Sequence, residues 1–284
     1  MKKGQLVSVV IPVYNRADCI GKCLESVFAQ SYSNIEVIVV DDGSSDHLAE
    51  RMKSVKDSRL KFLSYHLNKG ACYARNYGAQ HASGQYIAFQ DSDDTWRPQK
   101  LEKQLKFLEA CDADMVFCAM NRIPDRGKSF KFPVHAFDNR KDALSQILYE
   151  NRVSTQTMFM KRETWEAVKF DETVRRYQDW NFAIRAAHVC KMRYQDEILV
   201  DSKVGNDSIS SVEKSMSALD KLFEKNRKDY QEHPVCLARM YRRMGRRVRK
   251  SDKKQAKEYF YQSYLTERNL RNWLGYRGFY FLEE

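Results

Sequence analysis

The strongest constraint on the fold is an alternation of short apolar runs with segments of helical periodicity over the first 120 residues. Apart from Ser8 and Glu36, residues 7–13 and 36–40 are apolar and mostly β-branched, which is typical of strands covered on both faces. Strands that alternate with helices predict βαβ units, so the expected fold class is α/β, with a mostly parallel sheet flanked by helices. The other elements expected in this part are strands at 60–65, 86–90 and 115–120 and helices at 18–29, 71–82 and 98–109.

The pattern becomes less regular after residue 120. Prolines and mixed charges at 123–138 indicate an irregular excursion. We therefore predict an α/β domain at residues 1–210 and a helical carboxyl-terminal extension at 211–284. The later elements expected are helices at 142–150, 163–168 and 181–188, strands at 155–160 and 194–200, and helical sequence from 213 onward.

The positive charge is concentrated near the carboxyl-terminal end. The chain of 284 residues has 49 basic and 38 acidic side chains, a formal charge of +11. Residues 221–284 hold 17 of the basic and 8 of the acidic side chains. The rest of the chain is almost neutral, which argues against a nucleic-acid binder with a positive surface throughout, and the sequence has no motif of such binders.

The cysteines and histidines predict neither a disulfide framework nor a zinc site. The seven cysteines are odd in number and form no Cys-x-x-Cys pair, and the six histidines match no zinc spacing. No run of about 18 apolar residues occurs, as a membrane-spanning helix would require. The run at 7–13 is interrupted by Pro12 and is expected to be a strand, not a secretory signal. We therefore expect free thiols in the cytoplasm.

Acidic clusters follow two of the expected strands. Asp41-Asp42 ends the second strand, and Asp91-Ser92-Asp93-Asp94 follows the strand at 86–90. Ligands of parallel sheets bind outside the carboxyl ends of the strands, so these carboxylates should share one rim. In an extended segment the side chains of Asp91 and Asp93 point to the same side. This arrangement suits a hard cation such as Mg²⁺ or Mn²⁺ that shares its coordination shell with phosphate oxygens.

Asp42 has two possible roles at this rim. Its carboxylate can accept a hydrogen bond from a nucleobase or from ribose hydroxyls, or it can belong to a turn before a helix, a role for which Asp46 is already suited. The sequence contains neither a Gly-x-Gly-x-x-Gly loop nor a P-loop. A metal ion together with Arg75 is the natural substitute for holding phosphates.

Four ordered motifs resemble those of the family 2 glycosyltransferases, which are inverting enzymes with the Rossmann-like GT-A fold. The resemblance covers about residues 5–205 and is of the bacterial polysaccharide-biosynthesis type. The motifs are Val7-Ser8-Val9-Val10-Ile11-Pro12-Val13-Tyr14-Asn15, Val39-Val40-Asp41-Asp42-Gly43-Ser44-Ser45-Asp46, Asn68-Lys69-Gly70 with Ala74-Arg75-Asn76, and Phe89-Gln90-Asp91-Ser92-Asp93-Asp94.

The resemblance implies a nucleotide-sugar donor, most often a UDP-sugar, lying across the strand ends. It implies that Pro12 and Tyr14 line the pocket of the base and that Asp42 contacts uracil. Asn68 and Arg75 are expected to hold the nucleotide, with Arg75 near the base or the phosphates.

The resemblance also implies a divalent metal, Mn²⁺ or Mg²⁺, on the diphosphate. Asp93 is the expected metal ligand, and Asp91 is expected to contact the ribose or the donor sugar. Family members often add a histidine just past the last strand, but residues 203–210 contain none. Asn206, Asp207 or water would have to replace it, which leaves the third ligand open.

The segment Tyr177-Gln178-Asp179-Trp180 resembles the family's acidic pair ahead of a helix. The resemblance implies that Asp179 is the base that removes the proton of the acceptor hydroxyl as it attacks in a single displacement. The structural alternative is that Asp179 caps a helix beginning near Asn181.

We therefore expect an inverting glycosyltransferase that transfers a sugar from a UDP-sugar to a glycan or polyprenyl-linked acceptor in cell-surface polysaccharide biosynthesis. A sugar-phosphate nucleotidyltransferase is one alternative, but it would need a glycine-rich loop where Pro12-Val13-Tyr14-Asn15 stands. A non-catalytic module that binds nucleotide-sugars or polyanions is another, and it would not need Asp179.

Residues 239–257 hold ten basic side chains and one acid, around apolar residues at helical spacing. One hypothesis is that this segment lies on the anionic inner face of the cell membrane, which would make the enzyme peripheral. The other is a helical hairpin with a solvated basic face, completed by the aromatic stretches at 259–264 and 273–281. The sequence does not distinguish between them.

Overall fold

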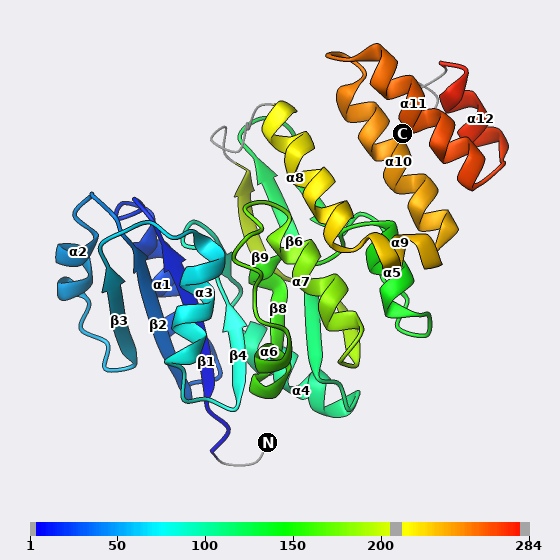
Figure 1. The fold of residues 1–284 in the computed structure, drawn as a ribbon. Coiled ribbons are helices and arrows are strands. Elements are labelled where there is room, and N and C mark those ends of the chain that lie inside the picture. Colours follow the sequence, from blue (N-terminus) through cyan, green and yellow to red (C-terminus); the bar gives the residue numbers. More distant parts are fainter. Residues whose placement is uncertain (1–3, 205–211, 279–284) are drawn as a thin grey trace. The chain divides into compact units, whose positions relative to one another are not determined.

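The computed structural model describes residues 4–204 and 212–278. The chain divides into two compact units, each described here by itself (Figure 1). The first comprises Met1–Lys141 and Arg152–Asn206, and the second comprises Asp142–Asn151 and Asp207–Glu284. A short stretch from the middle of the chain therefore belongs to the helical unit. The domain boundary at residue 210 stays a prediction.

The first unit is built on one mixed sheet, which has nine strands among the described residues. The spatial order is β3-β2-β1-β4-β8-β6-β9-β5, with β7 paired to β6. β1, β2, β3 and β4 are parallel to one another, whereas β8 runs antiparallel between β4 and β6. The strands are β1 (Val7–Val13), β2 (Ile35–Asp42), β3 (Leu60–Tyr65), β4 (Tyr86–Phe89), β5 (Thr95–Trp96), β6 (Met115–Pro124), β7 (Phe130–Phe132), β8 (Met158–Lys161) and β9 (Met192–Val204).

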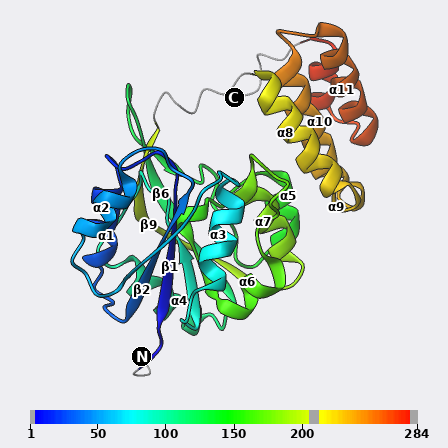
Figure 2. The same ribbon diagram turned by 60° about the vertical axis from the view of Figure 1, so that its left-hand side comes forward.

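Helices cover both faces of this sheet, and Figure 2 shows α1 and α2 on one side and α3 and α7 on the other. The apolar sides of α1, α2 and α4 pack on one face of the sheet in a single core cluster. The expected α/β class with a helix-flanked sheet is thus confirmed. The helices of this unit are α1 (Ile20–Phe28), α2 (Leu48–Ser54), α3 (Ala71–Gln80), α4 (Lys100–Ala110), α6 (Arg162–Val168) and α7 (Gln178–Ala187), with a 3-10 turn at Thr155–Thr157.

Helix α3 approaches the sheet closely at a glycine. A Cβ atom at Gly78 would lie 2.5 Å from Cγ1 of Val10 on β1 and 2.8 Å from Cγ2 of Val40 on β2. Both valines are fully buried. The absence of a side chain at Gly78 therefore sets how near α3 lies to the two strands whose ends carry the motifs.

The excursion expected at residues 123–138 is partly regular. Strand β6 continues to Pro124, and β7 (Phe130–Phe132) returns beside it as an antiparallel hairpin. The chain shows no strand-like alternation here, because much of this hairpin is exposed and carries polar side chains on both faces. Helix α4 begins at Lys100, two residues later than the expected start at residue 98.

The second unit is helical throughout its described residues. Its helices are α5 (Ala143–Tyr149), α8 (Val212–Lys225), α9 (Arg227–Glu232), α10 (Pro234–Val248), α11 (Lys253–Thr266) and α12 (Leu270–Tyr276). The apolar side of α10 is buried, and Gly245 lies against the ring of Phe260 on α11. The basic segment thus forms a helical hairpin with α11 as its second half, as one of the two hypotheses expects, although Arg242 is buried and not solvated. Its association with a membrane stays a prediction. No helix among residues 4–204 and 212–278 combines the length and apolar character needed to cross a membrane.

The contact at Gly78 can be tested with a matched pair of variants. Gly78→Ala should lower the free energy of unfolding by about 1–3 kcal/mol, because branched core side chains must move. Gly21→Ala, on α1, would meet only the guanidinium of Arg51, the far end of a long side chain. It should leave stability unchanged or raise it by up to about 1 kcal/mol through helix propensity. Urea unfolding measures both, and equal effects would contradict the packing argument.

Candidate active site

A cavity of about 300 Å³ opens where β1 and β2 end and the chain leaves β4. The seven residues that the resemblance assigned to the nucleotide, the donor and the metal all line it, brought together from four separate segments. Asp179 is not among the lining residues. The lining consists of Pro12, Val13, Tyr14, Asp42, Asn68, Gly70, Ala71, Arg75, Asp91, Ser92 and Asp93.

The two aspartates at the end of β2 have different tasks. Asp41 accepts a hydrogen bond from the amide of Ser44 at 2.8 Å and so shapes the turn. Asp42 accepts from the amides of Lys69 at 2.7 Å and Gly70 at 2.9 Å, and from the hydroxyl of Tyr65 at 2.8 Å. Its carboxylate therefore anchors the loop before α3 and keeps further acceptor capacity for a ligand.

Gly43 makes this anchoring possible. Its φ is +74°, and a Cβ atom there would lie 2.8 Å from the backbone nitrogen of Asn68. A residue with a side chain would be strained in this conformation and would push the loop away from the end of β2. The loop that carries Asn68 and Gly70 thus reaches the cavity because the residue after Asp42 is glycine.

Arg75 links two parts of the site. Its guanidinium is buried, with Nη2 donating to Oδ1 of Asp91 at 2.7 Å and Nη1 donating to Oε1 of Gln178 at 2.7 Å. Asp91 follows β4, whereas Gln178 opens α7. A charge-assisted bond of this kind holds both segments in fixed positions around the cavity. In this structure Arg75 orients the site, and its contact with a nucleotide stays a prediction.

The carboxylates after β4 repel one another. Burial and the nearby charge of Asp91 raise the pKa of Asp93. Burial, followed by the charges of Asp91 and Asp93, raises the pKa of Asp94 to about 8. The side chain of Asp94 points inward, where it accepts from Nε2 of Gln156 at 2.6 Å. A cation in the cavity would relieve this repulsion.

The donor set fits a metal that takes most of its ligands from phosphates and water. In the parts of the chain that the structure describes, no three histidine, cysteine or acidic side chains gather as a preformed metal cage. Asp93 offers a partly desolvated carboxylate at the cavity, as Mg²⁺ or Mn²⁺ with a diphosphate requires. Asn206 and Asp207, the candidates for a further ligand, lie outside the described residues.

Asp179 lies in the first turn of α7, directly after the residue that Arg75 contacts. The helix begins at Gln178, so Asp179 is not its N-cap residue. Its Oδ1 accepts from the amide of Trp180 at 2.8 Å, and its side chain is half-buried. The hydrogen bond between Arg75 and Gln178 thus connects the cavity to the helix turn that carries the predicted base.

Sequence reasoning missed three residues of the site network. Gln178 accepts a hydrogen bond from Arg75, and Tyr65 donates one to Asp42. Gln156 donates one to Asp94, which lies 62 residues away in the sequence. Gln178 was visible in the motif before α7, but nothing in the sequence indicated its partner. Tyr65 ends the predicted strand at 60–65, two residues before the loop it supports.

Comparison with solved structures defines the fold class. Staphylococcus aureus TarS 1–349, solved with UDP, matches with a TM-score of 0.63 at 18% identity, covering 98% of this chain and 92% of that one. The mannosyltransferase PcManGT from Pyrobaculum calidifontis, solved with GDP-Man and Mn²⁺, matches with a TM-score of 0.65 at 17% identity, covering 97% and 83%. The fold is therefore the GT-A glycosyltransferase fold expected from the motifs.

Comparison of sequences defines the family. Residues 8–190 match the family described as glycosyl transferase family 2. The chain therefore belongs to this family.

Similar proteins are bacterial glycosyltransferases. An uncharacterized glycosyltransferase of Rickettsia felis is 34% identical over 175 residues, which are 61% of this chain and 29% of that protein. The amylovoran biosynthesis glycosyltransferase AmsB of Erwinia amylovora is 35% identical over 191 residues, 63% of each chain. WfaP of Escherichia coli, a UDP-Glc:α-D-GlcNAc-diphosphoundecaprenol β-1,3-glucosyltransferase, is 43% identical over 105 residues, 37% of this chain and 42% of that protein. The chain thus spans less than a third of the Rickettsia felis relative.

The acidic cluster predicts an unusual pH dependence of stability. The pKa of Asp94 rises from 3.8 to about 8 on folding, so between these values the folded state binds more protons than the unfolded state. The stability of the metal-free protein should therefore fall as pH rises from 5 to 8. Asp94→Asn, which keeps an acceptor for Gln156, should remove most of this slope. Thermal unfolding in EDTA across that range measures it, and equal slopes in both proteins would show that Asp94 is not the cause.

Proposed function

We propose that this protein is an inverting glycosyltransferase that transfers a sugar from a UDP-sugar to a glycan or lipid-linked acceptor in cell-surface polysaccharide biosynthesis. The observation that carries the proposal is the cavity of about 300 Å³, on which seven predicted side chains from four segments converge. Such a crevice at the carboxyl ends of parallel strands is where α/β proteins bind nucleotides.

The proposed donor lies with its base against Pro12 and Tyr14 and its diphosphate toward Asp93. Tyr14 is 48% exposed at the cavity, which leaves its ring accessible for stacking on a base. Asp42 retains acceptor capacity for a base N–H after its three bonds to the loop. The donor named for WfaP is UDP-Glc, which supports a uridine nucleotide.

Asp93 and Asp91 are proposed to have different roles in binding the donor. Asp93 would hold the divalent metal, which, when bound, neutralises the charge that develops on the leaving diphosphate. Asp91 is oriented by its 2.7 Å ion pair with Arg75, and it is proposed to accept from hydroxyls of the ribose or the donor sugar. An ordered carboxylate of this kind fixes the position of the sugar relative to the acceptor.

Asp179 is proposed as the base. In a single displacement the acceptor hydroxyl attacks the anomeric carbon from the side opposite the leaving diphosphate, and its proton passes to a carboxylate. Asp179 adjoins Gln178, whose bond to Arg75 fixes this turn of α7 against the cavity. The acceptor of WfaP is a diphosphoundecaprenol-linked sugar, and the proposed acceptor is of the same lipid-linked class. We therefore propose a cytoplasmic enzyme that works at the inner face of the membrane.

Asp179→Asn tests the base. The variant keeps the acceptor oxygen for the amide of Trp180, so it should fold and bind UDP with unchanged affinity, while transfer falls by roughly 10²–10⁴-fold. Asp112→Asn is the control, because Asp112 lies at the amino end of β6 and its side chain is 93% exposed. Product formation with a panel of UDP- and GDP-sugars and a lipid-linked acceptor measures the effect. Transfer by Asp179→Asn at the wild-type rate would overturn the assignment.

Asp93→Ala tests the metal site. UDP affinity in the presence of Mn²⁺ should fall by about tenfold or more, because the link between protein and diphosphate is lost. Affinity in EDTA should change little, since the base pocket remains. Calorimetric titration of both proteins with UDP, with and without Mn²⁺, gives the comparison. An unchanged Mn²⁺-dependent gain in the variant would rule out Asp93 as the ligand.

A further inference from the structure

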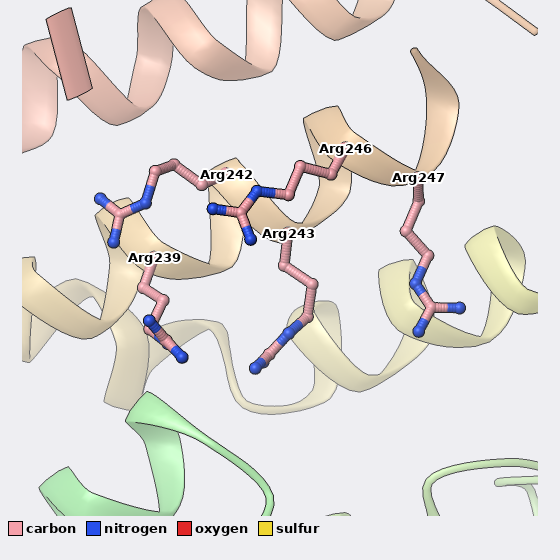
Figure 3. Close-up of a pocket in the computed structure, with 5 residues that line it drawn as sticks. All are labelled: Arg239, Arg242, Arg243, Arg246 and Arg247. Atoms are coloured by element: carbon pink, nitrogen blue, oxygen red, sulfur yellow. The ribbon is translucent and has the colours of Figure 1, made fainter. Parts of the chain in front are cut away.

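Five arginines of α10 form a cluster on the helical unit, which we call the arginine pocket. Arg239, Arg242, Arg243, Arg246 and Arg247 line a cavity of about 160 Å³. They stand at positions i, i+3, i+4, i+7 and i+8 of one helix, so they share a face. Figure 3 shows the side chains of Arg239, Arg243 and Arg247 extending to the same side of α10.

Two of these guanidinium groups are held in place by other helices of the unit. Arg242 is only 4% exposed and donates through Nη1 to Oδ1 of the buried Asn272 on α12. Arg239 donates through Nε to the backbone oxygen of Tyr149 at 3.0 Å, stacks on its ring at 4.1 Å, and lies 3.8 Å from the carboxylate of Glu150. The pocket is therefore partly preorganised.

The like charges of the pocket act on one another. Burial and then the charges of Arg271 and Arg239 lower the pKa of Arg242 to about 10. Burial and then the charge of Arg271 also lower the pKa of Arg246. Packing positive groups so closely destabilises the folded unit, and a bound anion would reverse that effect.

We propose that the arginine pocket binds a phosphate or diphosphate group. Arginine forms bidentate bonds to phosphoryl oxygens and is the residue best suited to a site of this kind. The cavity is smaller than the roughly 300–1,000 Å³ typical of pockets for drug-sized ligands, so it fits a small anionic group and not a whole nucleotide. Binding requires no contribution from the donor cavity.

Two sources can supply this chemistry. One is a phosphoryl group carried by a lipid, either a phospholipid headgroup or the diphosphate of a polyprenyl-linked acceptor. The other is a free anion such as inorganic pyrophosphate. The link to a lipid-linked acceptor rests on the proposed function, whereas the binding itself is measured without any transfer reaction. Failure of one can therefore be distinguished from failure of the other.

The test compares two double variants of the full chain that remove the same charge. Arg243→Gln with Arg247→Gln removes two members of the pocket but keeps Arg242, which supports the fold. Lys253→Gln with Lys254→Gln removes two exposed charges at the start of α11 that do not line the pocket. Thermal unfolding establishes that both variants are folded.

Binding is measured in about 0.15 M salt, where diffuse surface attraction is largely screened. Inorganic pyrophosphate is titrated in EDTA, so that no metal supports the donor cavity. Vesicles of phosphatidylcholine with phosphatidylglycerol, and vesicles of phosphatidylcholine alone, are tested by flotation. The pocket variant should lose roughly tenfold or more in affinity for pyrophosphate, for phosphatidylglycerol vesicles or for both, while the lysine variant loses less than about twofold.

The possible outcomes distinguish a site for a free diphosphate, a site for a lipid headgroup, and the absence of a specific site. Selective loss with pyrophosphate supports a site for a free or exposed diphosphate, and selective loss only with phosphatidylglycerol vesicles supports a lipid headgroup. Equal losses of affinity in the two variants would mean that binding depends on the overall positive charge and not on the pocket, which would overturn the proposal. Absence of saturable binding by the wild-type protein to either probe would overturn it without any variant, even if the pocket variant failed to fold.

Discussion

The ion pair between Arg75 and Asp91 is the interaction on which the candidate site depends. It joins α3 to the segment after β4, and the same guanidinium reaches Gln178 at the start of α7. Arg75 is buried whereas Asp91 is 30% exposed, so the pair is partly shielded from solvent, and loss of Asp91 would deprive a buried guanidinium of its carboxylate. Without Arg75, Asp91 would lose its ion pair, and the repulsion among the three carboxylates after β4 would be less compensated. The ion pair therefore offsets part of the negative charge of this cluster.

Two further contacts fix the position of α3, the helix that carries Arg75. Asp42 fixes the loop before α3, and Gly78 allows α3 itself to lie close to β1 and β2. The helix that carries Arg75 is thus positioned at both ends by contacts with the strands that line the cavity. The residues that line the cavity come from loops and strand ends, while the buried sheet supplies the rigidity that holds their geometry.

Local sequence pattern predicted most of the first 120 residues, because β1, β2, β4 and most of β6 are buried apolar runs; β3 is only partly buried, and the two-residue β5 was not expected. The motifs also predicted which residues line the cavity. The partners could not be predicted, since Arg75 and Gln178 are 103 residues apart and the inward turn of Asp94 depends on Gln156. The hairpin of β6 and β7 was missed because its exposed, polar residues lack strand alternation. The arginine pocket likewise required the pairing of α10 with α5 and α12.

The central claim is that one cavity holds both the nucleotide and its metal. A crystal structure of the protein with UDP and Mn²⁺, with the metal located by its anomalous scattering, tests it most directly. The account predicts a Mn²⁺ peak that joins the carboxylate of Asp93 to the diphosphate, with the uracil ring against Tyr14 and its N–H toward Asp42. A nucleotide bound outside this cavity, or a metal with no bond to Asp93, would contradict it.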